Sequence, residues 1–435
     1  MEGKEELYRP PETFIVKTTA RHFEHDGKGV RRILPKTTAR SDVNVQDLCV
    51  VQSVNKIRIK KKEEPLVLKL KKMFATVVVL AMAISLLSGC DSGTTAPSSN
   101  ASTPESGAST PAESTPVELV RSVNIATQAV GTSYYSMGTG IAKIITDNTP
   151  IQATILPYAG PDAWMPEFND GTITLEVISS MDMYWAYTGT VNYTTPSEDT
   201  RLLLSGNWSN HCTMTVLESS GITSIKDLAG KRVGYEYGGN KLTVNLIDAA
   251  LASVGLTIDD CVAVPLADLS SAQRALQERR VDCIFTGSST TPSSVQLDES
   301  IGIRVLPLGD LKPEDIADGV PEEVQSVLDQ YVPGATALVC PASGTVKEDT
   351  VLTSYPIQMG VSAKLSEDDV YTIMKAIYEN YTQLADVHAW GADWTPGNYV
   401  VENFQVPYHD GAVKFYKEVG LWTDAAEATQ AALLK

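Results

Sequence analysis

A short polar loop after the first apolar segment of the acidic part of the chain carries residue types that can bind an anion. The segment "VNIATQ" (123–128) predicts a strand, and the loop after it consists of Gly131, Thr132, Ser133, Tyr134, Tyr135 and Ser136. In open α/β sheets, ligands bind beyond the carboxyl ends of strands and next to helix N-termini. Unpaired N–H groups and the helix dipole at such a place favour a carboxylate, and the hydroxyl and phenol groups can add further contacts. The alternative is an ordinary helix N-cap with one tyrosine in the core.

The same geometry selects three further groups of candidate ligand-binding residues. They are Ala159 with Gly160, then Ser180 with Asp182, and then Tyr237, Gly238, Gly239 and Asn240. The last group opens a helix in the second half of the chain, so we expect it to contact the ligand from the opposite side. Asp182 can accept a hydrogen bond from an ammonium group, or it can cap the following helix. Arg201 and Lys241 are the nearest cations.

Three tryptophans fall near predicted strand ends. Trp164, Trp185 and Trp208 can each form a wall of the binding cleft or be buried in the core. We count Trp208 among the ligand-binding candidates.

Catalytic and metal-binding motifs are absent from the sequence. The chain has no G-x-S-x-G, H-E-x-x-H, Walker loop or EF-hand loop. His211, His388 and His409 do not adjoin a nucleophile motif, and we expect each to be a surface or structural residue. We therefore predict no enzyme activity, no cofactor and no metal. Widely spaced cysteines at 212, 261, 283 and 340 are expected to be small apolar strand residues, or else a disulfide pair.

Residues 70–90 have the pattern of a bacterial lipoprotein signal peptide. Lys71 and Lys72 precede an apolar run of about 15 residues, which is short for a membrane span. The run ends in Leu87-Ser88-Gly89-Cys90, which resembles a lipobox with Cys90 as the lipidated residue. A buried core helix is the alternative, but a long polar tract follows directly.

The position of this signal predicts that residues 1–69 are a non-native upstream extension. Residues 1–72 contain 17 Lys+Arg and 10 Asp+Glu, whereas the other 363 residues contain 18 and 43. Translation from an alternative start codon at Leu70 would explain this change in composition. Residues 91–117 are almost wholly Ser, Thr, Pro, Ala, Gly and Glu, and we predict a flexible tether spanning roughly 30 Å. This tether favours a bacterium with one membrane over one with two.

The acidic remainder of the chain argues against nucleic acid as a partner, because it has no Lys/Arg cluster to neutralise phosphates. The same acidity argues against electrostatic docking to anionic lipid. We expect the body to be held outside the cell membrane by its lipid, and to be monomeric.

Strand-like and helix-like segments alternate along the body, which predicts a parallel-rich α/β fold. Strands are expected at 123–128, 151–159, 174–182, 201–208, 231–238, 261–266, 281–287 and 303–308. Helices are expected at 136–148, near 162–169, and at 223–230, 241–255, 270–280, 366–387 and 410–422. The pattern occurs once on each side of "NHCTMTVL" (210–217), so we predict two lobes: 118–212 plus 358–435 as lobe I, and 213–357 as lobe II.

Three stretches together resemble the TAXI family of solute receptors of TRAP transporters. They are "SYYSMGTGIAKIITDNTPIQATI" (133–155) with the element Gly131-Thr132-Ser133-Tyr134-Tyr135 at its start, "SSMDMYWAYTG" (179–189) and "VPYHDGAVKFYKEVGLW" (406–422). The segment "GITSIKDLAGKRVGYEYGG" (221–239) is shared more widely among bilobed binding proteins. The chain departs from the family at Tyr158–Asp162 and at Trp208–Asn210, both of which border the expected cleft.

The resemblance implies a two-lobed, type II periplasmic-binding-protein-like fold with a ligand cleft between the lobes. It implies closure on a small organic acid or acidic amino acid, around strands crossing near 209–217 and 355–361, and delivery to a TRAP membrane permease. Two alternatives remain: the substrate-binding lipoprotein of an ABC importer, and a ligand-presenting subunit of a membrane sensor.

Overall fold

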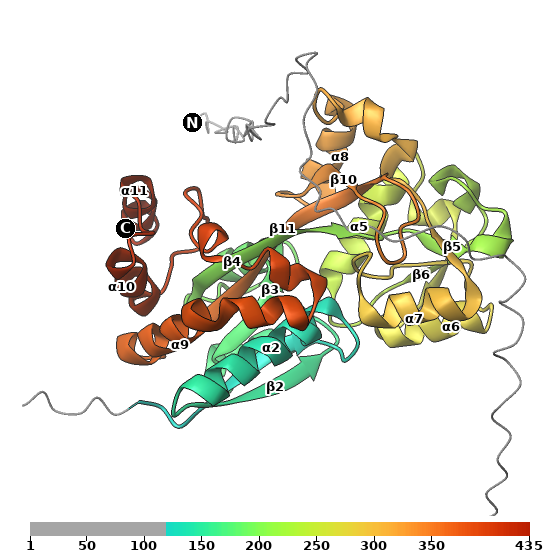
Figure 1. Cartoon of the computed structure of the whole chain (residues 1–435). Coiled ribbons are helices and arrows are strands. Elements are labelled where there is room, and N and C mark those ends of the chain that lie inside the picture. The colour runs from blue at the N-terminus through green and yellow to red at the C-terminus, as the bar shows by residue number, and fades with distance from the viewer. Residues whose placement is uncertain (1–118) are drawn as a thin grey trace, which may run out of the picture. The chain divides into compact units, whose positions relative to one another are not determined.

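The computed structural model describes residues 119–435, which form two α/β lobes (Figure 1). The predicted two-lobed α/β fold is confirmed by its two separate sheets, one of six strands and one of five. The first lobe is the six-stranded sheet with the helices that pack on it, and the second lobe is the five-stranded sheet with its helices. The predictions of an upstream extension, a signal peptide, lipidation at Cys90 and a tether lie outside the described residues.

The first sheet has the strand order β10-β11-β3-β1-β2, with β4 also paired to β11. Its strands are β1 (Ser122–Gln128), β2 (Gln152–Tyr158), β3 (Leu175–Ser179), β4 (Thr200–His211), β10 (Thr336–Cys340) and β11 (Thr350–Ser362). β1 runs parallel to β2 and β3, whereas β11 is antiparallel to β3, β4 and β10. The parallel strands bring the ends of β1 and β2 to one edge of the sheet.

The second sheet has the order β7-β6-β8-β5-β9 and repeats this mixture of pairings. Its strands are β5 (Thr215–Leu217), β6 (Arg232–Tyr235), β7 (Val262–Pro265), β8 (Cys283–Ile284) and β9 (Ile303–Val305). β6 is parallel to β7 and β8, and β5 is antiparallel to β8 and β9.

Two long paired strands connect the lobes. β4 leads directly into β5 of the second sheet, and β11 pairs with β4 over nearly its whole length. β10 pairs only with the first part of β11, Thr350–Ser354, and packs against α8 of the second lobe. The chain therefore leaves the six-stranded sheet after β4 and returns to it at β10.

Helices cover both sheets because each has an apolar face. Those of the first lobe are α2 (Ser133–Asn148), α3 (Pro161–Asp170), α4 (Ser180–Thr188), α9 (Glu367–Asn380), α10 (Asp410–Glu418) and α11 (Asp424–Leu433). Those of the second lobe are α5 (Lys241–Ala252), α6 (Leu269–Gln277), α7 (Pro292–Ile301) and α8 (Glu322–Tyr331). α2 packs on β1 and β2 and lies beside α9 (Figure 1). Met137, Ile141, Ile144 and Ile145 form its buried stripe.

One predicted strand is too long. The segment 174–182 was expected to be extended throughout, but α4 begins at Ser180. Ser179 is the N-cap of this helix, and its hydroxyl oxygen accepts a hydrogen bond from the Asp182 N–H at 2.9 Å. This cap ends the strand and starts the helix. The capped turn predicted around Ser224 and Asp227 is present as a short 3₁₀ helix, Ile225–Leu228.

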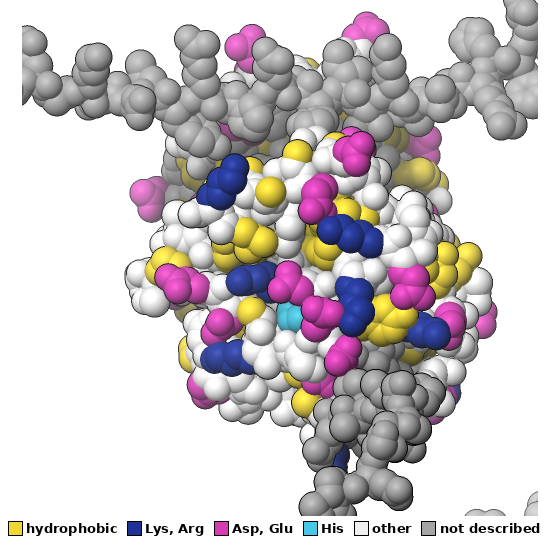
Figure 2. All heavy atoms as spheres, turned by 90° about the vertical axis from the view of Figure 1, so that its left-hand side faces the viewer, with side chains coloured by type: hydrophobic (Ala, Val, Ile, Leu, Met, Phe, Trp, Pro, Cys, Tyr) yellow, Lys and Arg dark blue, Asp and Glu magenta, His cyan; other side chains and the backbone are white. Residues whose placement is uncertain are grey.

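Opposite charges are interspersed on the face formed by the C-terminal helices (Figure 2). Lys414 lies near Glu367 and Asp368, and Lys417 lies 2.8 Å from Glu427. This face therefore presents no basic patch. Within residues 119–435, no helix combines the length and the apolar composition that crossing a membrane requires.

Candidate functional site

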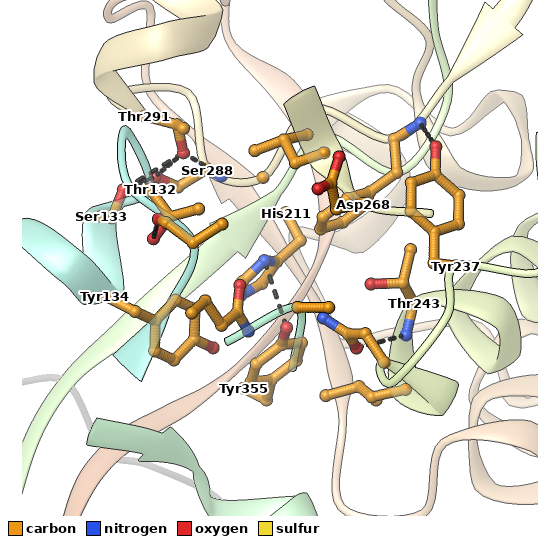
Figure 3. A pocket seen from close by; sticks show the side chains of 18 of the residues that line it. Thr132, Ser133, Tyr134, His211, Tyr237, Thr243, Asp268, Ser288, Thr291 and Tyr355 are labelled. Carbon is orange, nitrogen blue, oxygen red and sulfur yellow. Dashed lines mark hydrogen bonds between the residues drawn. The ribbon is translucent and has the colours of Figure 1, made fainter. Parts of the chain in front are cut away.

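A pocket lies between the two lobes, with a cavity volume of about 30 Å³ (Figure 3). Its first-lobe lining comprises Gln128, Ala129, Thr132, Ser133, Tyr134, Ala159, His211, Tyr355 and Trp390. Its second-lobe lining comprises Tyr237, Asn240, Leu242, Thr243, Asp268, Leu269, Phe285, Gly287, Ser288 and Thr291. Clefts with aromatic walls and a few convergent polar groups are the usual form of small-molecule sites.

Four helices begin at the wall of this pocket. Their N-cap residues are Thr132 of α2, Asn240 of α5, Asp268 of α6 and Thr291 of α7, and all four line the pocket. The first N–H groups of a helix have no partner within the helix, and they carry the positive end of its dipole. Four such ends around one small space make it favourable for a negatively charged or acceptor-rich group.

Three hydroxyl groups join the lobes at one side of the pocket. The Ser133 hydroxyl, in the first lobe, lies 3.0 Å from that of Ser288 and 3.1 Å from that of Thr291, both in the second lobe. Gly131 makes this approach possible, because its φ is +89° and an added Cβ would come within 3.1 Å of Ser293 Cβ. The carbonyl oxygen of Gly131 accepts a hydrogen bond from Ser293 N–H at 3.1 Å. The lobes are therefore in direct contact around the pocket.

A stacked pair of rings forms the base of the pocket at the strands that connect the lobes. His211 ends β4 and Tyr355 lies in β11; their ring centroids are 3.9 Å apart, with an interplanar angle of 9°. The Tyr355 hydroxyl lies 3.2 Å from His211 Nδ1. On the other side, the His211 ring is nearly parallel to that of Phe285, 6.3 Å away. His211 is fully buried, and this burial lowers the pKa of its imidazole to about 3, so the ring is neutral at physiological pH.

Asp268 is the only charged side chain among the residues that line the pocket. One of its carboxylate oxygens accepts a hydrogen bond from Ser271 N–H at 2.7 Å, as the N-cap of α6. Arg201 and Lys241, the nearest cations in the sequence, are not among the lining residues. A bound anion would therefore meet no cationic side chain of the lining, but N–H groups and hydroxyls, with the Asp268 carboxylate also at the wall.

Five of the predicted ligand-binding residues line the pocket. They are Thr132, Ser133, Tyr134, Tyr237 and Asn240, from both lobes. Eight others do not line it: Gly131, Tyr135, Gly160, Ser180, Asp182, Trp208, Gly238 and Gly239. Gly160 and Gly239 instead lie where the lobes touch, because a Cβ on Gly160 would come within 2.3 Å of the Gly239 carbonyl oxygen.

The structure places Asp182 in the alternative capping position. Its carboxylate accepts a hydrogen bond from the Ser179 hydroxyl at 2.9 Å, within the first turn of α4. Desolvation and the nearby Asp162 raise the pKa of the buried Asp182 carboxyl to about 8. Trp164 and Trp185 are core residues, whereas the Trp208 side chain is 51% exposed and lies outside the pocket. The four described cysteines are free. Cys283 and Cys340 lie in strands as expected, whereas Cys212 and Cys261 lie just outside strands.

His211 was expected to be a surface or structural residue, and a surface position is wrong for it. His388 and His409, by contrast, are structural helix caps. In each of them, Nδ1 accepts a backbone N–H at 3.1 Å and Nε2 lies within 3.1 Å of a backbone carbonyl oxygen. The sequence did not reveal the lining residues Asp268, Ser288 and Thr291 either. For Asp268, the pattern Asp-x-x-Ser before a helix was an available signal.

Comparison with known structures gives distant similarity to solute-binding proteins. The alkanesulfonate-binding protein SsuA from Xanthomonas axonopodis pv. citri, bound to MOPS, is 14% identical, with 71% of this chain and 96% of that chain covered and a TM-score of 0.38. An ancestral arginine-binding protein bound to arginine is 14% identical over 64% of this chain and 99% of its own, with a TM-score of 0.38. A TctC solute-binding protein from Polaromonas is 13% identical over 63% and 94%, with a TM-score of 0.35.

A family model gives a match to the chain itself. The model of the NMT1-like family matches residues 125–420, from the first strand of the six-stranded sheet to the loop after α10. This segment includes both sheets and every residue that lines the pocket. Because the match spans more than half of the chain, the protein belongs to the NMT1-like family.

Proposed function

We propose that the protein is an extracytoplasmic solute receptor whose lobes close on a small carboxylate-bearing solute, either an organic acid or an acidic amino acid. The observation that carries the proposal is the pocket between the lobes, onto which the N-termini of α2, α5, α6 and α7 open. Each helix end stabilises a negative charge by about 0.3–1 kcal/mol. The hydroxyls of Ser133, Ser288 and Thr291 supply further donors.

The lobes move about the connecting strands in this proposal. The moving units are lobe I, 118–212 plus 358–435, and lobe II, 213–357. This division differs from the division by sheets, because it moves β10 and the first part of β11, including Tyr355, with α8. A ligand can shift the balance between open and closed forms only through contacts that differ between them. Residues from both lobes that line one pocket meet this condition. Of the residues selected from the sequence, the five that line the pocket make the direct contacts: Thr132, Ser133, Tyr134, Tyr237 and Asn240.

Cys90 carries the lipid that holds the body at the outer face of the cell membrane, and a TRAP-type permease receives the solute. This part of the proposal is supported by the resemblance of residues 131–155, 179–189 and 406–422 to the TAXI family. An operon that encodes TRAP permease subunits beside this gene would agree with it, whereas ABC importer subunits there would contradict it.

Native mass spectrometry tests the binding function directly. The body, residues 118–435, would be purified gently, and any retained small molecule would be identified after denaturation. A stoichiometric adduct that carries a carboxylate is the expected result. If there is no adduct and no organic acid or amino acid raises the melting temperature, the proposed anion site is wrong.

A further inference from the structure

Two buried polar atoms in the pocket have no hydrogen-bond partner among residues 119–435. They are Nε2 of His211 and the hydroxyl oxygen of Tyr134. Their residues are 1% and 5% exposed, and both line the pocket. The Tyr134 hydroxyl and the His211 ring turn toward the same central space (Figure 3). A buried polar group without a partner costs about 1–3 kcal/mol, so a solute that binds both atoms would recover that cost.

The stacked Tyr355 does not determine which nitrogen of His211 carries the proton. Its hydroxyl lies 3.2 Å from Nδ1, but the two rings are nearly parallel, with centroids 3.9 Å apart, so this hydroxyl lies over the face of the imidazole. The lone pair of an unprotonated ring nitrogen lies in the plane of the ring, so this contact fixes no donor or acceptor role. The neutral ring holds one proton, on Nδ1 or on Nε2.

Tyr134 is a second donor held in a fixed position. Its ring packs edge-to-face against Trp390, with centroids 5.2 Å apart and an interplanar angle of 81°. Burial, and to a lesser extent the nearby Asp182 carboxyl, raise the pKa of the Tyr134 hydroxyl, so it stays protonated. Tyr134 belongs to the first turn of α2, and its hydroxyl therefore acts beside the helix N-terminus.

We propose that the proton of His211 is on Nε2, and that this Nε2–H and the Tyr134 hydroxyl form a charge-neutral, two-donor subsite that binds an acceptor oxygen of the solute. The inference rests on the proposed function and deepens it. The oxygen belongs to a carboxylate, keto or amide group, since only such an oxygen accepts from both donors at once. The His211 ring stacks on Tyr355 of the connecting strand, and its centroid lies 6.3 Å from that of Phe285 in the second lobe, so the bound oxygen lies where the two lobes meet.

Paired substitutions at position 211 separate the role of Nε2 from that of Nδ1. An asparagine amide ends near the position of Nδ1 and does not reach that of Nε2. A glutamine amide is longer and does reach the position of Nε2. Titration calorimetry on the full chain would use succinate and L-glutamate as probes. We expect His211→Asn and Tyr134→Phe each to weaken binding by about tenfold or more. His211→Gln is expected to stay within about threefold of the wild type.

Matched controls come from residues of the same type outside the pocket. His409→Gln changes a histidine whose two nitrogens are already bonded, and Tyr416→Phe removes a hydroxyl that donates to the Leu203 carbonyl oxygen. Neither change should alter affinity, although both should lower the melting temperature. If the probes bind the wild type and bind His211→Asn and Tyr134→Phe equally well, the subsite is wrong while the receptor function stands. If neither these probes nor any other organic acid or amino acid binds the wild type, both proposals fail.

Nitrogen NMR tests the tautomer without any solute. In the full chain labelled with ¹⁵N at histidine, the His211 signals would be assigned by their loss in His211→Asn. We expect a protonated Nε2 and an unprotonated Nδ1, with the Nε2 signal moving when succinate is added. A proton on Nδ1 would contradict the donor assignment and overturn the proposal.

Discussion

The carboxylate of Asp162 in the first lobe accepts a hydrogen bond from the backbone N–H of Lys241 in the second lobe, at 2.8 Å. Lys241 is the first residue of α5, and Asp162 lies in the first turn of α3. The side-chain amide of Asn192 donates to the other oxygen of Asp162. A carboxylate of one lobe thus caps a helix of the other, and it does so outside the residues that line the pocket.

Replacing Asp162 with alanine is expected to favour the open form. Loss of this charge-assisted bond removes roughly 1–2 kcal/mol from the closed form. We expect a larger radius of gyration by small-angle X-ray scattering without solute, and affinity for solute that is about five- to thirtyfold weaker. Asp424→Ala is the matched control, because it also removes an acidic residue from a first helical turn, that of α11. Equal radii for the two variants would contradict the capping role.

Gly160 sets how closely the lobes approach each other. Its backbone is extended, so any residue can adopt its conformation, but a Cβ would come within 2.3 Å of the Gly239 carbonyl oxygen and 2.6 Å of Asn240 Cβ. Gly160→Ala should therefore leave each lobe folded and prevent closure. We expect an almost unchanged melting temperature without solute and at least about tenfold weaker binding.

Gly238→Ala is the control for this substitution. It lies in the same loop as Gly239, but its added Cβ would meet only the Ala267 carbonyl oxygen, at 3.5 Å. We expect binding by Gly238→Ala to match that of the wild type. If Gly160→Ala also binds normally, contact between the lobes at this point is not needed for binding.

Glu176 is a fully buried carboxyl in the middle of the first sheet. One of its oxygens accepts a hydrogen bond from Trp164 Nε1 at 2.7 Å, and the other has no partner among the described residues. Gly360, its neighbour on β11, leaves room for it, because a Cβ there would come within 2.6 Å of that free oxygen. Burial raises the pKa of the Glu176 carboxyl to about 7.

Glu176→Gln is expected to remove a pH dependence of stability. The folded chain holds a proton on Glu176 that the unfolded chain loses near its lower pKa, so the stability of the wild type falls as the pH rises from about 4.5 to 7. At about 1.4 kcal/mol per pKa unit, the variant should gain up to about 3 kcal/mol relative to the wild type over this range. Chemical denaturation at pH 5, 6, 7 and 8 measures the difference.

Glu427→Gln is the control for this substitution, because the pKa of the Glu427 carboxyl is shifted in the opposite direction. Glu427 is exposed, and its hydrogen bonds with Lys417 and Trp422 lower the pKa of its carboxyl. The difference between this variant and the wild type should therefore not rise with pH. A flat difference curve for Glu176→Gln would show that Glu176 is ionised in the folded protein at all these pH values.

Local patterns predicted most of the elements. The strands β1, β2, β4 and β6 and the helices α2, α5, α6 and α10 lie where apolar periodicity and capping residues indicated them. α7 was missed because only Ser294 and Leu297 of its residues are buried, which gives almost no apolar stripe. α4 was read as strand as far as residue 182, although Ser179 and Asp182 have the spacing of a helix cap.

The pocket was predicted only in part, because its composition depends on pairings far apart in the sequence. Loops at strand ends could be selected by their position, which identified Thr132, Ser133, Tyr134, Tyr237 and Asn240. His211 and Tyr355 meet because β4 pairs antiparallel with β11, and no local pattern encodes that register. Ser288 and Thr291 enter the pocket through contact between the lobes.

Asp268 is expected to select between solutes with and without an ammonium group. Asp268→Asn keeps an oxygen that can accept the Ser271 N–H, so α6 stays capped, and only the negative charge is lost. We expect affinity for L-glutamate to fall by about fivefold and affinity for succinate to rise by about the same factor, each roughly 1 kcal/mol. Calorimetry on both solutes gives the ratio, with Asp410→Asn in the first turn of α10 as the control. Equal changes for the two solutes would mean that the Asp268 charge acts on the pocket as a whole and contacts no ammonium group.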